Sequence, residues 1–366
     1  MEVSSVEFDV AVIGGGLAGA SAAITAARFG ARVVMLEAGE FPRHKVCGEF
    51  VSAESLELLC DLLRSTPSAD QLIRAAPVID KTRLYHASRV LEAPVHPPAL
   101  SIPRYAMDSS LWETAKQLGV EARSSCDVAT AQGVGPFQLD TSKGNLSTKS
   151  VIVAAGRWSK FRARVPIPNA PKWIGVKAHY REQSPALSTD LYFFDHGYCG
   201  VQPVADDVVN ACAVVRSDSA TSLEDVFTLH PALAERRRFW QAMTEPVTTA
   251  PLLHFPPQPV RDTMMFAGDA AAFIDPFVGD GISIALRSGR LAAMHLRACL
   301  AGAGSLLSAL TAYEEDYSRQ FVPLVSAAAR IRGLLSWPMP ARMFVFELLR
   351  FPGLMPYVIR RTRQSA

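Results

Sequence analysis

The sequence predicts an α/β fold: a Rossmann-like dinucleotide-binding domain, an antiparallel β-sheet domain and C-terminal helices. Three observations support this prediction. A glycine-rich turn follows an apolar strand near the N-terminus, a Gly-Asp and Gly-x-Gly pair follows another apolar run near residue 268, and two stretches between them alternate in strand fashion. Because the nucleotide-binding motifs come from both ends of the chain, we expect that domain to be discontinuous.

The first element is a strand at 9–13, a turn at 14–19 and an Ala-rich helix to about residue 29. Gly14 allows the tight turn, Gly16 lets the backbone approach a pyrophosphate, and Gly19 lets helix and strand pack closely. Ala18 lies in the same turn and is expected to contact the ligand. The positive end of the helix dipole favours the phosphates.

The next strand, 32–36, ends at Glu37, 23 residues after Gly14. A carboxylate at this position accepts hydrogen bonds from the adenosine ribose. The fingerprint alone fits both FAD and NAD. The distant C-terminal motif favours FAD, because FAD has a ribityl chain and ring for a second motif to hold. The residues expected there are Gly268, Asp269, Pro276, Gly279, Gly281 and Ile282, the last opening a helix.

These motifs, together with the segment 43–48 (Arg-His-Lys-Val-Cys-Gly), resemble the geranylgeranyl-reductase-like flavoproteins of the para-hydroxybenzoate hydroxylase superfamily, which are related to flavin-dependent halogenases. The resemblance covers roughly residues 8–300. It implies a fold of the para-hydroxybenzoate hydroxylase type and non-covalent FAD, with NADPH or NADH as electron donor. It also places Arg43, Lys45, Cys47 and Gly48 beside the flavin ring and makes Arg104, before a helix expected at 109–118, a candidate cofactor contact.

The central motif of that superfamily, Gly-Ala-Asp-Gly-x-x-Ser, stands here as Ala-Ala-Gly-Arg-Trp-Ser at 154–159. Its Asp is absent, so the sequence leaves open how a nicotinamide donor is bound. We expect the FAD-binding domain at 1–75, 104–160 and 262–304, the substrate-binding domain at 76–103 and 161–261, and a helical segment at 305–366.

Residues that bind FAD are shared by enzymes with different reactions, so the type of reaction is predicted here from the residues of the substrate sheet. Lipid-reducing members of the family carry Tyr-x-Trp-x-Phe-Pro beside the flavin, whereas this chain retains Tyr198 but has Gly200 and Gln202 at the Trp and Phe positions. Small residues at Cys199 and Gly200 leave room for a ring-bearing substrate, and Gln202 could bind its phenol or carbonyl.

We therefore expect NAD(P)H-dependent monooxygenation of a hydrophobic aromatic, polyketide or isoprenoid compound. Alternatives are C=C reduction in an isoprenoid lipid, halogenation, and a non-catalytic electron-transfer role. The candidate catalytic residues are Cys47 and Tyr198, although each could equally be a packed core residue. His44 could relay a proton or lie on the surface.

Composition restricts the remaining possibilities. A formal net charge of +2 argues against nucleic-acid binding, and the six cysteines show no metal-ligand spacing. Without a leader or a long apolar run, we expect a cytoplasmic monomer or homodimer. The basic and apolar segment 330–363 either contacts a membrane surface or caps the substrate domain with buried helices.

Overall fold

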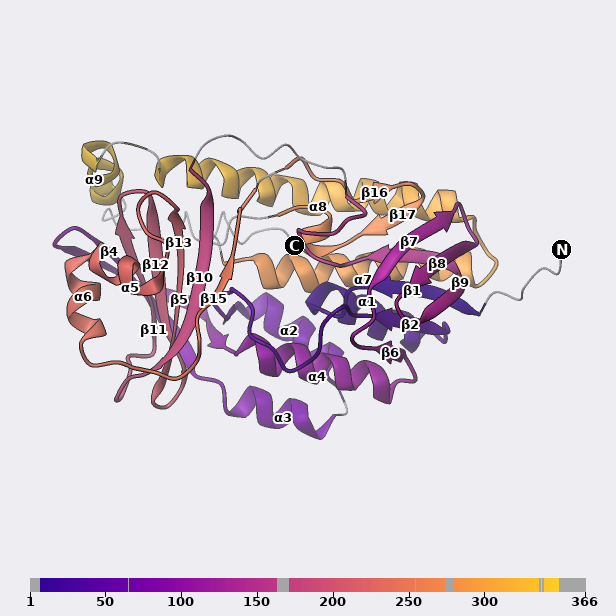
Figure 1. Ribbon diagram of the computed structural model, residues 1–366, viewed down its shortest axis with the longest axis horizontal. Coiled ribbons are helices and arrows are strands. Elements are labelled where there is room, and N and C mark those ends of the chain that lie inside the picture. The colour runs from indigo at the N-terminus through magenta and orange to yellow at the C-terminus, as the bar shows by residue number, and fades with distance from the viewer. Residues whose placement is uncertain are drawn as a thin grey trace.

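The computed structural model describes residues 7–64, 66–162, 171–253, 255–273, 279–335, 337 and 339–348. Two mixed β-sheets lie side by side along the long axis of the molecule (Figure 1). This arrangement confirms the α/β class with a Rossmann-like part, a separate sheet and C-terminal helices. Pro276 and residues 349–366 of the basic segment lie outside the described residues.

The first sheet has the parallel centre expected of a dinucleotide-binding fold. Its strand order is β16-β17-β9-β1-β2-β6, and β1 pairs in parallel with both β2 and β9. An antiparallel meander of β7 and β8 extends it from β9. The strands are β1 (Phe8–Ile13), β2 (Val33–Leu36), β6 (Glu121–Arg123), β7 (Val128–Gly133), β8 (Phe137–Thr141), β9 (Gly144–Val153), β16 (Val260–Arg261) and β17 (Met264–Phe266).

Helices α1 and α7 pack closely because small residues face each other. A Cβ on Gly289 of α7 would overlap the backbone of Ala18 in α1. This contact brings the two glycine motifs together, although they are about 260 positions apart in the chain. The helices of this part are α1 (Leu17–Arg28), α2 (Ala53–Leu62), α3 (Pro67–Arg74), α4 (Arg104–Gln117), α7 (Gly281–Leu300) and α8 (Leu306–Leu335), with a 3-10 turn η1 (Gly268–Ala270).

Helix α4 begins at Arg104, so the predicted start at Ser109 was wrong. The backbone N–H of Arg104 donates to the Glu49 carboxylate at 2.8 Å, which satisfies one of the open donors at the helix start. Because this cap comes from a residue 55 positions away, no local pattern marks the helix start.

The second sheet, expected to be antiparallel, is mixed. Its order is β14-β10-β13-β12-β11-β4-β5-β3, with β15 on β10, and β11 pairs with β4 in parallel. The short β3, within the segment expected to bind FAD, pairs with β5 of this sheet. The strands are β3 (Phe50–Val51), β4 (Val78–His86), β5 (Arg89–Ser101), β10 (Trp173–Arg181), β11 (Ser188–Phe194), β12 (Gly197–Ala205), β13 (Val208–Arg216), β14 (Gln241–Ala242) and β15 (Val247–Thr249).

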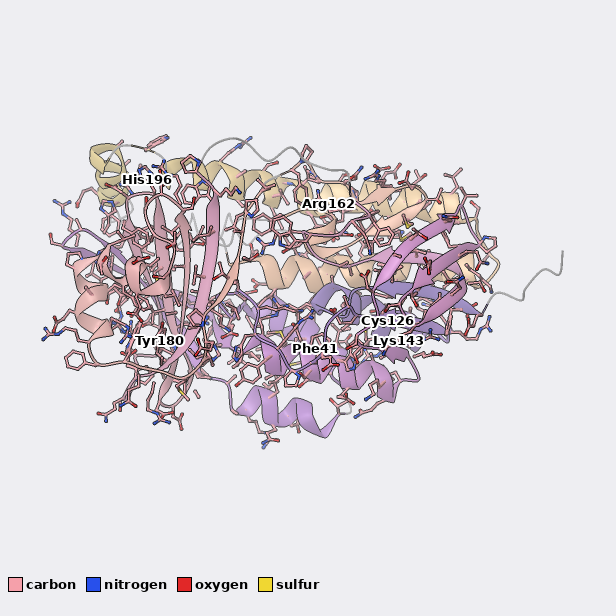
Figure 2. The ribbon with its side chains drawn as sticks, in the orientation of Figure 1. Phe41, Cys126, Lys143, Arg162, Tyr180 and His196 are labelled. Carbon is pink, nitrogen blue, oxygen red and sulfur yellow. The ribbon has the colours of Figure 1, made fainter. Side chains whose placement is uncertain are left out.

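The two faces of the second sheet differ in character. One face is an apolar cluster next to α5 (Leu223–Thr228) and α6 (Pro231–Arg237), to which Tyr180, Tyr192 and Val201 belong. The other face carries polar side chains, such as Lys177 and His179, which contact Glu49. In Figure 2, Tyr180 lies within this sheet and Arg162 lies between the two sheets. The polar face is therefore the one that bounds the site.

Helix α8 runs along the molecule from the first sheet toward the second, and α9 (Met339–Leu348) lies at the end of the second sheet (Figure 1). Arg342 donates to the Phe194 carbonyl and pairs with Asp195, while the Phe346 ring stacks on His86. The described part of the basic segment thus packs on the second sheet. Among the described residues, no helix is both long and apolar enough to cross a membrane.

Candidate functional site

A cavity of about 720 Å³ lies where the first sheet, the 43–50 segment and β15 meet. It collects both predicted glycine motifs and the segment between them. The predicted residues that line it are Gly14, Gly16, Ala18, Glu37, Arg43, Lys45, Cys47, Gly48, Arg104, Gly268, Asp269, Gly279, Gly281 and Ile282. Gly19, Tyr198, Cys199, Gly200 and Gln202 do not line it.

The glycine turn leaves bare backbone at the start of α1. Gly14 has a φ of +106°, and a Cβ there would overlap the Ala154 carbonyl. A Cβ on Gly19 would overlap the Gly14 carbonyl, which is the close helix–strand approach expected from the sequence. A Cβ on Gly16 would meet only the end of the Lys45 side chain, at 3.3 Å. Glycine at position 16 therefore preserves space for a ligand, whereas Gly14 and Gly19 are required by the fold.

Glu37 is buried and already accepts several hydrogen bonds. Its Oε2 accepts from the Gly15 amide at 2.8 Å, and its Oε1 accepts from the Gly39 amide at 2.9 Å and from Arg43 at 2.7 Å. Burial acts to raise the pKa of this carboxyl, but these amides and the nearby Arg43 and Lys45 hold it below its usual range. A carboxylate has further lone pairs, so Glu37 can still accept from a ribose hydroxyl.

The 43–48 segment runs along the cavity instead of lying at one end. Arg43 pairs with Glu37 at the end of β2, and Lys45 Nζ lies near Gly16 at the start of α1. Arg43 and Lys45, expected beside the flavin ring, thus contact the end of β2 and the glycine turn, which the sequence analysis assigned to the ribose and the pyrophosphate. Cys47 and Gly48 lie farther along, against the second sheet, because Asn210 of β13 donates to both of their carbonyls at 3.0 Å.

Asp108 is fully buried and pairs with two cations of the cavity wall, Lys45 and Arg104. It accepts from Arg104 through both oxygens at 3.0–3.2 Å and pairs with Lys45 at 2.9 Å. Burial favours the neutral carboxyl, yet Arg104 and Lys45 outweigh it and lower the pKa of Asp108. Asp108 thus orients two candidate cofactor-binding side chains, a role that the sequence analysis did not predict.

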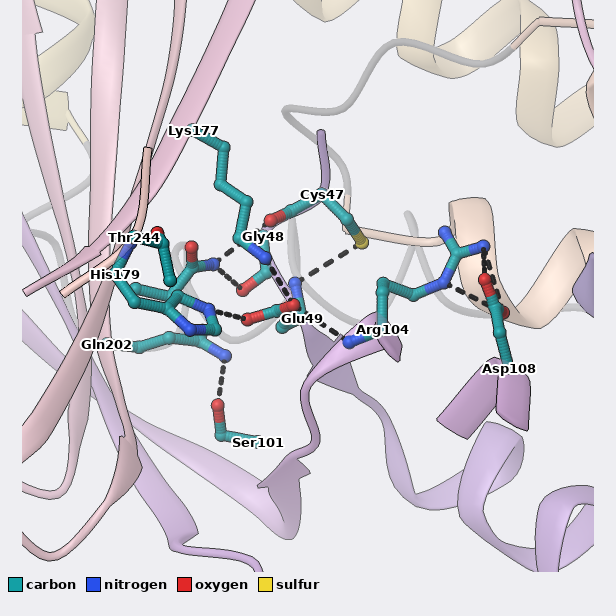
Figure 3. A network of polar contacts seen from close by, with 11 residues as sticks. Cys47, Gly48, Glu49, Ser101, Arg104, Asp108, Lys177, His179, Gln202 and Thr244 are labelled. Carbon is teal, nitrogen blue, oxygen red and sulfur yellow. Dashed lines mark hydrogen bonds and ion pairs between the residues drawn. The ribbon is translucent and has the colours of Figure 1, made fainter. Parts of the chain in front are cut away.

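Glu49 is the centre of a buried polar network that joins the two sheets (Figure 3). Its Oε1 accepts from Lys177 Nζ at 2.5 Å and from the Arg104 amide, and its Oε2 lies 2.8 Å from His179 Nε2. Glu49 has a φ of +64°, a left-handed conformation that costs a side-chain-bearing residue energy. Burial acts to raise the pKa of Glu49, but His179 and Lys177 hold it below its usual range.

This network and Asn210 fix the backbone of Cys47 and Gly48 at the cavity wall. The Glu49 amide donates to the Cys47 sulfur at 3.3 Å, so the thiol is held as well. His44 lines the cavity, and its ring packs at right angles to that of His179 with 5.0 Å between centroids. Burial lowers the pKa of His44, which favours the neutral ring. The segment is therefore prearranged by charges on β10 and by an amide on β13.

Sequence reasoning missed Glu49, Lys177, His179 and Asn210. One signal was available for two of them. Lys177 and His179 alternate with Val176 and Ala178 in a strand expected to be half-buried, so they had to share one face. What that face contacts is not encoded locally, because the partner Glu49 lies about 130 positions away.

The opposite side of the cavity carries charges that lack such partners. Arg157 and Asp269 line it, and Arg162 lies close by. Burial raises the pKa of Asp269, even though Arg157, Arg104, Arg162 and Lys45 oppose that effect. Among the described residues, no carboxylate pairs with Arg157 or Arg162 and no cation pairs with Asp269 within 4.0 Å.

The residues of β12 that were predicted to form a substrate wall do not all lie on the same face of the second sheet. Tyr198 lies on the polar face of the sheet, where it packs with Phe255 and Phe273. Cys199 points to the opposite face, in the apolar cluster next to α5 and α6, so its assignment to the substrate site was wrong. A strand turns successive side chains to opposite faces, and position 199 falls on the far one.

Gly200 and Gln202 share the face of Tyr198, but neither is free wall surface. Gln202 donates to Ser101 at 2.6 Å and accepts from Thr189 at 2.8 Å, so it links strands β5, β11 and β12. This pairing leaves the side chain committed to the sheet, which corrects its predicted role as a substrate contact. A Cβ on Gly200 would lie 3.3 Å from the Leu191 side chain.

Comparison with known proteins identifies the family of the chain. A family model described as "FAD binding domain" matches residues 7–326. The chain is 26% identical to the menaquinone reductase of Mycolicibacterium smegmatis, across 96% of this chain and 90% of that protein. It is 23% identical to "Conditioned medium factor receptor 1" of Dictyostelium discoideum, covering 79% of this chain but only 63% of the receptor.

Digeranylgeranylglycerophospholipid reductases and a tryptophan 2-halogenase are also relatives, which confirms the predicted resemblance. Among solved structures, the flavin-dependent brominase Bmp2 superposes with a TM-score of 0.78 at 21% identity, over 97% of this chain and 93% of the brominase. At that identity the brominase supports the fold alone. The bare glycine turn, Glu37 and the buried Asp269 fit a dinucleotide with a sugar chain in the cavity.

Proposed function

Since the chain belongs to the FAD-binding-domain family and is an FAD-dependent oxidoreductase, we propose that it oxidises or reduces a hydrophobic small molecule. The specific reaction that we propose is NAD(P)H-dependent monooxygenation of an aromatic, polyketide or isoprenoid compound. The observation that carries this proposal is the cavity between the two sheets. Its glycine motifs fit FAD, and its Phe273 belongs to an apolar cluster with Tyr198 of the second sheet. A hydrophobic ligand would enter at this junction.

The residues divide into two groups by the work they would do. Gly14, Gly16, Glu37 and Asp269 would hold FAD, which when bound supplies hydride transfer and reaction with dioxygen. The Glu49 network orients Cys47 and Gly48, and the apolar cluster around Phe273 excludes water from the neighbouring space. Cys47 and Tyr198 remain the candidates for substrate contact.

Reduction of a C=C bond in an isoprenoid lipid is the second candidate. It is supported by the menaquinone reductase and digeranylgeranylglycerophospholipid reductases among the relatives. Monooxygenation is supported by the sequence, in which Gly200 stands where a lipid-reducing wall has a bulky aromatic, although Gly200 itself does not line the cavity. Both candidates use the same cofactor site and differ in whether dioxygen is consumed.

A two-stage experiment separates them. The FAD-loaded protein is mixed anaerobically with NADPH or NADH, and bleaching of the flavin absorbance reports reduction. The reduced protein then receives an alkylphenol or a polyprenyl quinone, with and without dioxygen, and the product is weighed by mass spectrometry. We expect addition of one oxygen atom only when dioxygen is present. Addition of two hydrogen atoms under anaerobic conditions that remains after air has reoxidised any quinol to the quinone would establish the C=C reductase instead.

The cofactor assignment has its own test. Gly16→Val should abolish FAD retention, because the new side chain would occupy the space beside Lys45 that the diphosphate needs. Its far-ultraviolet circular dichroism should match the wild type, since a Cβ at this position meets only a flexible side chain. Full FAD occupancy in the variant would show that the diphosphate lies elsewhere.

A further inference from the structure

Arg157 is an exception among the cations that line the cavity. The other lysines and arginines there are each paired with a carboxylate: Arg43 with Glu37, Lys45 and Arg104 with Asp108, and Lys160 with Asp127. Within the described part of the chain, Arg157 has no such partner. Its Nη1 is buried and makes no hydrogen bond. A buried guanidinium donor without an acceptor is costly, so the site calls for a ligand that supplies one.

Arg162 repeats this pattern next to it. The residue is 9% exposed, and its Nε is buried and has no acceptor among the residues that the structure describes. Both guanidinium groups lie against aromatic rings: Arg157 is 4.3 Å from the Phe273 centroid, and Arg162 lies over Phe255. Stacking of this kind uses the flat face of a guanidinium and leaves its N–H edge for an oxygen acceptor.

The surroundings indicate what kind of molecule brings that acceptor. Phe255 and Phe273 belong to one buried apolar cluster with Tyr198, Val214 and Leu252. The arginines therefore stand at the edge of apolar surface on the substrate sheet. The start of α1, where a diphosphate binds, already has Lys45 beside Gly16.

We propose that Arg157 and Arg162 bind a singly charged oxygen group, a carboxylate or an acidic enol or phenol, at one end of an otherwise apolar substrate. This inference deepens the proposed function and rests on the junction being the substrate side of the cavity. Asp269 supplies at most one negative charge beside the two guanidinium groups, so at least one net positive charge is left for an anion. The pair thereby fixes which end of the substrate lies against Phe273.

The test measures binding to the FAD-loaded protein by titration calorimetry, with dodecanoate, methyl dodecanoate and dodecyl phosphate as probes. We expect dodecanoate to bind at least about 10-fold more tightly than its ester, because a charge-assisted hydrogen bond is made only by the acid. Arg157→Gln and Arg162→Gln should each weaken dodecanoate binding by about 10- to 100-fold and leave the ester unchanged.

Arg261→Gln is the matched control. Arg261 lies in the same region, but its guanidinium already donates to the Phe161 carbonyl and pairs with Asp262. This variant should keep the wild-type preference for dodecanoate. FAD affinity, measured by flavin fluorescence, should stay within about 3-fold of wild type in all three variants, a change below the roughly 10-fold loss expected for one charged hydrogen bond.

Four outcomes would overturn the proposal: no measurable binding of dodecanoate, equal affinities for acid and ester, tighter binding of dodecyl phosphate than of dodecanoate, or a loss of FAD affinity in the arginine variants without a change in probe preference. The last outcome would assign the pair to the cofactor diphosphate. The anaerobic reduction of the flavin by NAD(P)H is measured on the same samples, so failure of the oxidoreductase proposal is recognised separately.

Discussion

The two walls of the cavity hold their charges in opposite ways. On the wall formed by segment 43–50, α4 and β10, Glu49 and Asp108 are fully buried: Glu49 pairs with Lys177 and contacts His179, and Asp108 pairs with Lys45 and Arg104. On the wall after β9 and β17, Arg157, Arg162 and Asp269 lie near one another without an ion pair among the described residues. Within the described part of the chain, the lysines and arginines of the first wall have carboxylate partners without a ligand, whereas Arg157 and Arg162 of the second wall do not.

This difference shows where the protein is prearranged and where it is to be completed. A satisfied buried network fixes geometry, and removing one member leaves the others uncompensated. An unsatisfied group reduces the stability of the free protein and regains it when a ligand supplies the missing partner. Substitutions on the first wall should therefore mainly lower the stability of the free protein, and substitutions on the second wall should mainly weaken ligand binding.

The largest effect is expected from Glu49→Ala. It leaves the fully buried Lys177 without its carboxylate and should lower the free energy of unfolding by about 3–5 kcal/mol. The control Glu92→Ala removes a carboxylate from a half-exposed pair with Lys81 and Arg83 and should cost less than about 1 kcal/mol. Urea denaturation measures both, and equal losses would contradict the view of Glu49 as the centre of the network.

Asp269→Asn should act mainly on binding. Loss of a charged acceptor for a sugar hydroxyl should cost about 1.5–3 kcal/mol, or about 10- to 150-fold in FAD affinity. The FAD-free variant should be at least as stable as wild type, because a buried carboxylate without a paired cation is removed. Flavin fluorescence gives the affinity and urea denaturation the stability. Unchanged FAD affinity would remove Asp269 from the cofactor site.

Asn210→Ala tests whether the second sheet positions the 47–48 backbone. Two carbonyls lose their donor, and the expected cost is about 1–3 kcal/mol of unfolding free energy. If Cys47 and Gly48 lie beside the flavin, the absorption maximum of bound FAD should also shift. Gln202→Ala is the control: Gln202 lies opposite Asn210 in the neighbouring strand, but the hydrogen bonds of its amide go to Ser101 and Thr189. Identical flavin spectra in both variants would count against the positioning role.

The smallest effect is a difference in pH dependence. The pKa of Glu49 is lowered, so its stabilising contribution is present above 4.5 and is lost as the pH falls through its folded pKa. The pKa of Asp269 is raised, so it has the opposite sign: wild-type stability falls as the pH rises from 3.8 through the folded pKa. In FAD-free protein, the stability advantage of Asp269→Asn should therefore grow with pH across that window. A pH-independent difference would contradict the raised pKa.

The sequence by itself determined the elements whose signal is local. The strand, glycine turn and helix at 9–29, the Gly-Asp turn at 268–269 and the strand-like character of the stretch 173–215 follow from alternation, apolar runs and the freedom of glycine, all within a few residues. Together with the resemblance carried by the 43–48 segment, these were enough to predict the family and the cofactor.

Only the tertiary structure decided which charges are compensated. Glu49 caps α4 and meets Lys177 128 positions away, Asn210 reaches Cys47 across 163 positions, and the early start of α4 follows from the first of these contacts. The face that Cys199 occupies depends on the register of β12 with its neighbours, and the lack of a partner for Arg157 among the described residues depends on the elements around it. An electrostatic partner is chosen by distance in space, and sequence patterns of a few residues carry no information on distances between remote segments.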